Sequence, residues 1–202
     1  VATGYGRHLV QEHLPGVRVV SEIKAVATGA VWRQPGCRTV VDVGGQDTKV
    51  VSIDPSGRVG RFAMNDRCAA GTGQFLETMA ASLGLPDHGL SEAAAHAAQA
   101  RRLTSMCAVF ARSEVVGLVA RGVPREEIAL GVLLAVASRT ASLAGTIPVE
   151  DPVVFTGGCA ADERLVALVG SALGHRMIVP ESPRCVAALG CALLGSRQED
   201  RP

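Results

Sequence analysis

Three short segments rich in β-branched residues follow one another between residues 39 and 64, with only tight turns between them. They read TVVDV (39–43), TKVVSID (48–54) and RVGRFAM (58–64). Runs of this length and composition are typical of strands, and the Gly44-Gly45 pair indicates a two-residue hairpin turn. We therefore predict an antiparallel meander, and the chain must adopt a fold that contains a sheet.

The hydrophobic period changes from 2 to 3.6 after the meander, which indicates helices. A second strand signal, PVVFTGG, follows them and runs into a glycine pair. Helices mixed with strands in this order predict an α/β architecture. The other predicted helices cover about 4–14, 21–32, 75–83, 90–100, 109–121, 125–143, 160–173 and 184–195, and the other predicted strands cover 17–20, 152–158 and 176–180.

Charge and composition exclude several classes of partner. Lys and Arg total 20, Asp and Glu total 19, and aromatic residues make up 3%. Nucleic-acid binding is not expected, because it needs a basic surface or stacking platforms. No uninterrupted apolar run reaches the roughly 18 residues of a membrane span, and no signal peptide is visible. We expect a cytoplasmic protein without membrane contact.

Several common site motifs are missing from the sequence. The lysines are Lys24 and Lys49, and neither follows a glycine, so there is no Walker A loop. The histidines lack the spacing of a metal-binding helix. Six cysteines are present without a C-x-x-C pair, which excludes an ordinary zinc ribbon or bacterial ferredoxin run. Burial as small hydrophobes is the expectation for Cys37, Cys159, Cys185 and Cys191.

The stretch DVGGQDTK (42–49) is a candidate phosphate site. Asp42 ends a hydrophobic strand, and Gly44 and Gly45 allow backbone N–H groups to approach a ligand closely. Gln46 and Asp47 follow at the tip. Such a loop can bind phosphate, hold Mg²⁺ through water and orient an attacking water. An ordinary hairpin with a polar tip is the alternative.

The stretch FTGGCA (155–160) is a weaker candidate. A strand, the glycines Gly157 and Gly158, and a predicted helix start form a seat for an anion or a purine. The alternative is a tight turn between strand and helix, in which glycine is common.

The stretch NDRCAAGTGQFLE (65–77) places a cysteine before a predicted helix. If the helix begins near Ala69, its N-terminal N–H groups and dipole favour a thiolate at Cys68. Cys107 also directly precedes a predicted helix. Two such cysteines cannot hold a cubane cluster alone, but two from each of two subunits on a two-fold axis supply four ligands.

These motifs together resemble a known family. VVDVGGQDTKV, FAMNDRCAAGTGQFLETMA, CAVFARSEV and VFTGGCAADERLV, in this order, are similar to the CoA-substrate activases. These are ATPases related to the activator of 2-hydroxyacyl-CoA dehydratases and to the ATP-binding subunits of benzoyl-CoA reductase. The resemblance covers nearly the whole chain. It implies the ribonuclease H-like ATPase fold of actin, sugar kinases and heat-shock proteins.

The resemblance also implies roles for particular residues and a set of cofactors. The expected cofactors are ATP or ADP, Mg²⁺ and one [4Fe-4S] cluster per homodimer. The implied catalytic residues are Asp42, Gln46 and Asp47, the nucleotide-binding residues are Gly44, Gly45, Gly71, Thr72, Gly73, Thr156, Gly157 and Gly158, and the cluster ligands are Cys68 and Cys107.

The function implied is that of an ATP-driven one-electron donor. Reduced ferredoxin or flavodoxin would supply the electron, and a CoA-ester dehydratase or aryl-CoA reductase component would accept it. Two alternatives remain open from the residues alone. One is a small-molecule kinase of the same superfamily, such as an amino-sugar kinase, and the other is a non-catalytic fragment.

The chain also departs from the family pattern. The family's first phosphate loop, D-x-G-[ST], is not found, so we expect an N-terminally truncated activase with one complete ATPase half. The expected division is a remnant of the first half (1–36), the second half (37–182), and a C-terminal helix and tail (183–202). Val26 replaces a usual histidine and Arg112 a frequent acidic residue, and both are expected near the cluster or the cleft.

Overall fold

The computed structural model contains a five-stranded mixed sheet. It describes residues 1–66, 70–104 and 107–199, and for 197–199 it describes the backbone alone. The strand order is β3-β2-β1-β4-β5. β1, β2 and β3 are antiparallel neighbours, which confirms the meander, and β4 and β5 add to β1 in parallel. The strands are β1 (Thr39–Val43), β2 (Thr48–Ile53), β3 (Val59–Asn65), β4 (Val153–Thr156) and β5 (Met177–Ile178).

The loop between β1 and β2 is longer than predicted. The last residue pair of the hairpin is Val43 with Thr48, so four residues connect the strands. Neither glycine of the predicted turn has a positive φ, which a two-residue turn of the predicted kind requires at one or both central residues. Instead, the N–H of Gly44 donates to the carbonyl of Asp47 at 2.9 Å. The prediction of a two-residue turn was therefore wrong.

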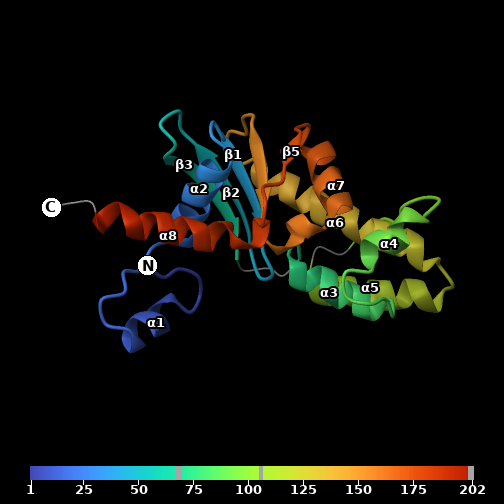
Figure 1. The fold of residues 1–202 in the computed structure, drawn as a ribbon. Helices are drawn as coiled ribbons and strands as arrows, with labels where there is room; N and C mark the ends of the chain where they lie inside the picture. The colour runs from blue at the N-terminus through green and yellow to red at the C-terminus, as the bar shows by residue number, and fades with distance from the viewer. Residues whose placement is uncertain (67–69, 105–106, 200–202) are drawn as a thin grey trace.

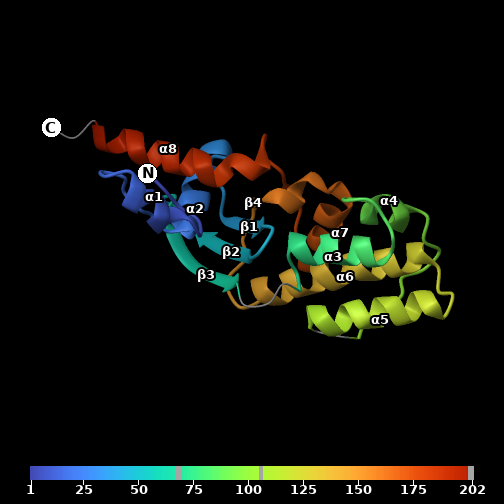
Figure 2. The ribbon, with the colours of Figure 1, turned by 90° about the horizontal axis from the view of Figure 1, so that it is seen from below.

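Helices cover both faces of the sheet (Figures 1 and 2). One face packs against α2 (Glu22–Arg33) and α8 (Val186–Glu199), with Val40, Val51 and Val154 in that core. The other face contributes Val41, Val50 and Phe155 to a larger core. That core includes α3 (Gly73–Ser82), α4 (Leu90–Ala95), α5 (Ala108–Ala120), α6 (Arg125–Ala144) and α7 (Glu163–Leu173). Because strand side chains alternate, β1, β2 and β4 each supply residues to both cores.

Backbone meets backbone where α2 and α8 pack together. A Cβ on Gly190 would lie 1.8 Å from the carbonyl oxygen of Ala25, and one on Gly29 would lie 2.1 Å from that of Val186. Contacts this short leave no room for any side chain at the two glycines. A further backbone contact attaches the turn before α8 to the loop that follows β4. The N–H of Gly157 donates to the carbonyl of Pro183 at 3.2 Å, and Pro183 lies in the 3₁₀ turn η2 (Pro183–Cys185).

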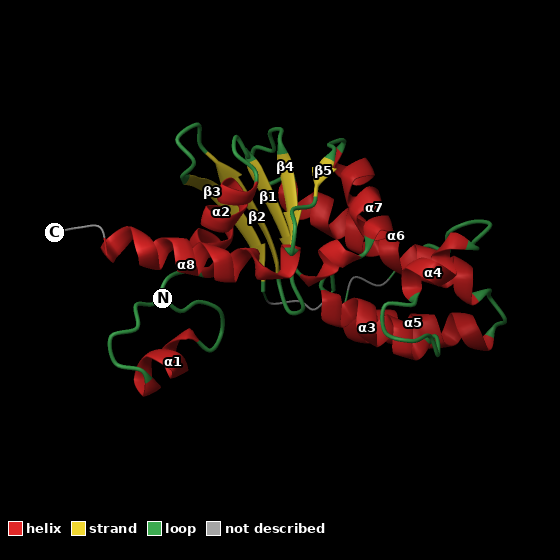
Figure 3. Cartoon of the chain, viewed as in Figure 1, coloured by secondary structure: helices red, strands yellow, loops and turns green. Residues whose placement is uncertain are grey.

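Several predicted elements differ in extent from the structure (Figure 3). The strand predicted at 17–20 is only an isolated bridge between Ala2 and Val19. The helix predicted over 90–100 ends at Ala95. The helix predicted from 160 is preceded by the 3₁₀ turn η1 (Gly158–Ala161). At the N-terminus, α1 (Arg7–His13) has no buried residue.

One helix in the described part of the chain is long and apolar enough to cross a membrane. It is α6, whose best 18-residue window has a mean hydropathy of 1.5, although polar residues interrupt its apolar run. Half of that window is buried inside the fold, and Ile128, Val132 and Val136 belong to the larger core. Packing of this kind is that of the core helix of a folded domain.

Candidate active site

A row of polar side chains crosses the sheet where β1 and β4 end. Thr156 pairs with Asp42 across the parallel strands, and Asp42 pairs with Lys49 across the hairpin. All three are buried, and they share the face that also carries Val40 and Val51. The hydroxyl of Thr156 donates to Oδ1 of Asp42 at 2.7 Å. The row therefore fixes the Asp42 carboxylate at the edge of the sheet, beside the β1–β2 loop.

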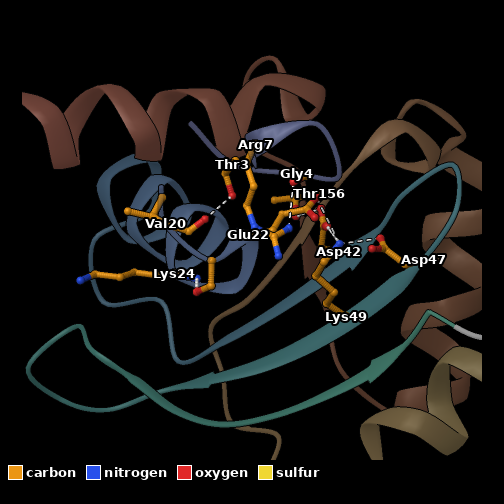
Figure 4. A network of polar contacts seen from close by, with 11 residues as sticks. Thr3, Gly4, Arg7, Val20, Glu22, Lys24, Asp42, Asp47, Lys49 and Thr156 are labelled. Atoms are coloured by element: carbon orange, nitrogen blue, oxygen red, sulfur yellow. Dashed lines mark hydrogen bonds and ion pairs between the residues drawn. The ribbon is translucent and has the colours of Figure 1, made fainter. Parts of the chain in front are cut away.

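Lys49 is the centre of an ionic cluster (Figure 4). Its Nζ lies 2.5 Å from Oδ1 of Asp47, 3.3 Å from Oε1 of Glu22 and 3.5 Å from Oδ2 of Asp42. Only 1% of the lysine side chain is exposed. Burial by itself lowers the pKa of Lys49, but attraction to Asp42, Asp47 and Glu22 outweighs it, so the pKa lies above its usual value. The ammonium is therefore charged.

The loop from Gly44 to Asp47 separates this cluster from a cleft. Gly44 donates its N–H within the loop, and Gly45 and Gln46 are exposed. The carbonyls of Gly44 and Gly45 accept hydrogen bonds from Gly73 and Gln74, each at 2.9 Å. These bonds attach the loop to the first turn of α3. Of the two loop glycines, Gly45 is the one that lines the cleft.

The cleft has a volume of about 620 Å³, within the range of ligand pockets. Gly45, Gly73 and Gly158 form one side, where the three glycine-containing loops meet. Asp162 lies on the wall and caps α7, accepting the N–H of Leu165 at 2.9 Å. Further lining residues come from α3, α4 and η2, among them Glu77, Ser91 and Arg184.

Gly157 is a position where only glycine fits. Its φ is +91°, a region that L side chains rarely adopt, and a Cβ there would lie 2.3 Å from the carbonyl oxygen of Val43. The α-helix after this glycine pair begins only at Glu163, beyond the turn η1. The predicted seat is therefore not at the N-terminus of an α-helix. Gly158 lines the cleft instead.

The helix that begins within the NDRCAAGTGQFLE stretch starts at Gly73, two residues before the predicted 75–83 and four after Ala69, the start considered for Cys68. α3 starts at Gly73 with Thr72 as its N-cap, because Gly71 has a φ of +107° and cannot continue a helix. Cys68 lies outside the described residues, and α3 begins five positions after it rather than near Ala69. Gly71 and Thr72 are buried and are not among the residues that line the cleft, and the Gly71 carbonyl accepts the Thr48 hydroxyl at 2.8 Å.

Cys107 is exposed and is the N-cap residue of α5, as the sequence predicted for its position. Cys37, Cys159 and Cys191 are buried as expected, but Cys185 is exposed, because it ends the surface turn η2. The thiol of Cys159 lines the cleft. Burial, followed by repulsion from Asp162, raises its pKa to about 12.

The two departures from the family pattern lie in different surroundings. Val26 is 1% exposed and packs from α2 against the sheet, and it is not among the residues that line the cleft. Arg112 is exposed on α5, five positions after Cys107.

Sequence reasoning missed Glu22 and Lys49 as site residues. A signal for Lys49 was present, because a hairpin that pairs Val43 with Thr48 sets Asp42 opposite Lys49. Predicting the pair required the loop length. Glu22 gave no comparable signal, since α2 reaches the cluster only through the packing of the fold.

The sheet and the helices that cover it have the actin-type fold. At the level of the fold alone, the chain is similar to MreB 5 of Spiroplasma citri bound to AMPPNP, with a TM-score of 0.57 at 12% identity over 95% of this chain and 63% of that one. Residues 1–195 match the model of the BadF/BadG/BcrA/BcrD ATPase family. The chain belongs to this family.

Several relatives are much more similar. The chain is 42% identical to the activator of lactoyl-CoA dehydratase from Anaerotignum propionicum, over 96% of this chain and 73% of the relative. Component A of the (R)-2-hydroxyglutaryl-CoA dehydratase of Acidaminococcus fermentans matches with a TM-score of 0.92 and 35% identity, over 98% and 76%. The activator of the 2-hydroxyisocaproyl-CoA dehydratase from Clostridium difficile with bound ADPNP matches with a TM-score of 0.89 and 35% identity, over 99% and 76%.

Proposed function

We propose that this chain is an ATP-dependent activase that passes single electrons to a 2-hydroxyacyl-CoA dehydratase or an aryl-CoA reductase. The match to proteins named as dehydratase activators along nearly the whole chain carries the proposal. The cleft supports it, because one such relative holds ADPNP. The small-molecule kinase and the non-catalytic fragment are not favoured, because the named relatives above are activators.

The residues around the β1–β2 loop would bind the phosphates. Gly44 and Gly157 use their N–H groups within the fold, so Gly45 and Gly158, which line the cleft, are the better donors to phosphate. Thr156 would position Asp42 rather than touch the nucleotide. Gly71 and Thr72 would support the cleft wall from behind.

The acidic residues of the loop suit the metal of a nucleotide complex. Carboxylate oxygens and water are the ligands that Mg²⁺ prefers. Asp42 and Asp47 offer such oxygens beside the loop, and Oδ2 of Asp47 is buried without a hydrogen-bond partner. We assign these two carboxylates to Mg²⁺, directly or through water. Exposed Gln46 is suited to orient the attacking water.

Cys68 and Cys107 would hold a [4Fe-4S] cluster together with the same residues of a second copy. The surroundings of Cys107 fit this role, because the residue is exposed and lies at the N-terminus of α5, where a ligand thiol is accessible. A cluster bound at this position supplies one-electron transfer. In this arrangement, α5 carries its ligand at the molecular surface, where an electron donor such as ferredoxin or flavodoxin can approach.

The helix that carries Cys107 has an apolar side turned to solvent. Val109, Phe110 and Val116 are 71%, 67% and 51% exposed, while Ala111 and Val115 on the other side of α5 are buried. Exposed apolar residues grouped on one helix indicate an interaction surface. A homodimer that shares the cluster would cover this surface or offer it to the dehydratase.

Anaerobic purification tests the proposal. The chain should carry about four iron and four sulfide per dimer, the content of one cubane cluster, and it should bind ADP. Cys107→Ser should lose the iron, while the control Cys185→Ser, an exposed cysteine away from α5, should retain it. A colourless protein with sugar-dependent ATP turnover would overturn the proposal in favour of a kinase, and failure to bind ADP would favour a non-catalytic fragment.

A further inference from the structure

Lys49 has no role in the proposed function, yet it has the most buried charge of the cluster. No more than 1% of its side chain is exposed, compared with 30% for Glu22. The ammonium comes from the second residue of β2, an interior strand of the sheet, and its partners come from α2, β1 and the β1–β2 loop. One cation thus joins three separate parts of the fold.

The cluster carries more negative than positive charge. Three carboxylates face one ammonium, so the formal charge is −2. Asp42 is satisfied on both oxygens, by Thr156 and by Lys49. Asp47 is satisfied on Oδ1 only, and its Oδ2 is buried without a partner. A buried acceptor without a partner, in a site of charge −2, makes the binding of additional positive charge energetically favourable.

The position of Lys49 conflicts with a metal at the centre of the carboxylates. One oxygen from each of Glu22, Asp42 and Asp47 lies within 4.8 Å of the others, a spacing that could hold a metal ion. However, the ammonium lies within 3.5 Å of all three oxygens. A divalent cation ligated by all three would meet the ammonium at contact distance, and like charges at such a distance repel strongly.

We infer that Lys49 is a positioning residue that occupies the acidic site as a resident cation while no nucleotide is bound. It holds Asp42 and Asp47 in place and keeps free divalent cations out, so that the metal enters only with the phosphates of the nucleotide. This inference rests on the proposed nucleotide site. It adds that the site selects the metal–nucleotide complex over the free metal.

Binding of Mn²⁺ to the nucleotide-free full chain tests this inference, with electron paramagnetic resonance to measure free Mn²⁺. The variant Lys49→Met removes the ammonium at similar length, and the lost repulsion should raise Mn²⁺ affinity at least about tenfold. Lys49→Arg keeps the charge and should stay close to wild type. Lys24→Met is the matched control, because Lys24 is exposed and is the other lysine of the chain.

The Mn²⁺ measurements can overturn the inference in two ways. Unchanged Mn²⁺ affinity in Lys49→Met, or an equal rise in Lys49→Arg or Lys24→Met, overturns the inference. If Lys49→Met is unfolded without metal, Mn²⁺ should restore its folded circular dichroism spectrum, and failure at millimolar Mn²⁺ also overturns it. None of these measurements uses ADP or iron, so they are independent of the proposed activase function, which fails if wild-type protein binds no ADP.

Discussion

Replacement of Gly190 by alanine is the most direct test of the backbone contact between α2 and α8. The added Cβ would lie 1.8 Å from the Ala25 carbonyl oxygen, and real Cβ atoms come no closer than 3.0 Å. The two helices would have to separate by about 1.2 Å, the difference between these distances. The obstructing atom belongs to the backbone, so no rotation of a side chain can relieve the contact.

The expected cost combines two opposing terms. Overpacking of a core costs about 1–3 kcal/mol and occasionally more, and alanine regains about 1 kcal/mol of helix propensity over glycine. Because backbone must move here, we expect a cost above that range and a net loss of about 2–3 kcal/mol in the free energy of unfolding.

Urea unfolding followed by circular dichroism measures this loss. Gly195→Ala, on the same helix, is the matched control, because the nearest atom to its Cβ would be Val1 Cγ2 at 3.6 Å. The control should be stabilised by up to about 1 kcal/mol. If Gly190→Ala were as stable as Gly195→Ala, the close approach of the two helices would be refuted.

Four further predictions concern the cleft and the cysteines. Gly157→Ala should abolish ADP binding measured by calorimetry, because both its φ and the Val43 carbonyl exclude a side chain. Asp162→Ala should lower the free energy of unfolding by about 1–2 kcal/mol in urea titrations, since it removes the N-cap of α7; a loss below 0.5 would contradict the capping role. In the cluster-free chain at pH 8, iodoacetamide should label exposed Cys107 within minutes but Cys159 only after unfolding, because burial raises the pKa of Cys159 to about 12. The same shift means that stability falls as pH rises from 9 towards 12, where the thiol ionises only in the unfolded chain, and Cys159→Ala should reduce this fall.

Local patterns predicted the sheet well. The meander follows from three adjacent β-branched runs with turns between them, and family motifs confirmed by the comparisons fixed the ATPase fold. Boundaries that depend on single glycines were less accurate. Gly71 adopts a positive φ and delays the start of α3 to Gly73, which the helical pattern of the following residues could not reveal.

The ionic cluster lay beyond sequence reasoning for a different reason. The pairing of Asp42 with Lys49 depends on the strand register, which the four-residue loop sets. The contact of Glu22 with Lys49 depends on how α2 lies over the sheet, and no local pattern encodes that. A buried lysine can be explained only when its partners from all elements are known.

The hydrogen bond from Gly157 to Pro183 closes a ring of direct contacts that links the cleft to α8, α2 and the ionic cluster. Gly157 follows Thr156, and Pro183 leads into α8, which touches α2 without any intervening side chain at Gly190. α2 begins at Glu22, whose carboxylate contacts Lys49, the residue opposite Asp42 in the hairpin. Each link in this ring is a direct contact, so we expect a displacement of Gly157 to shift α8 and α2 together.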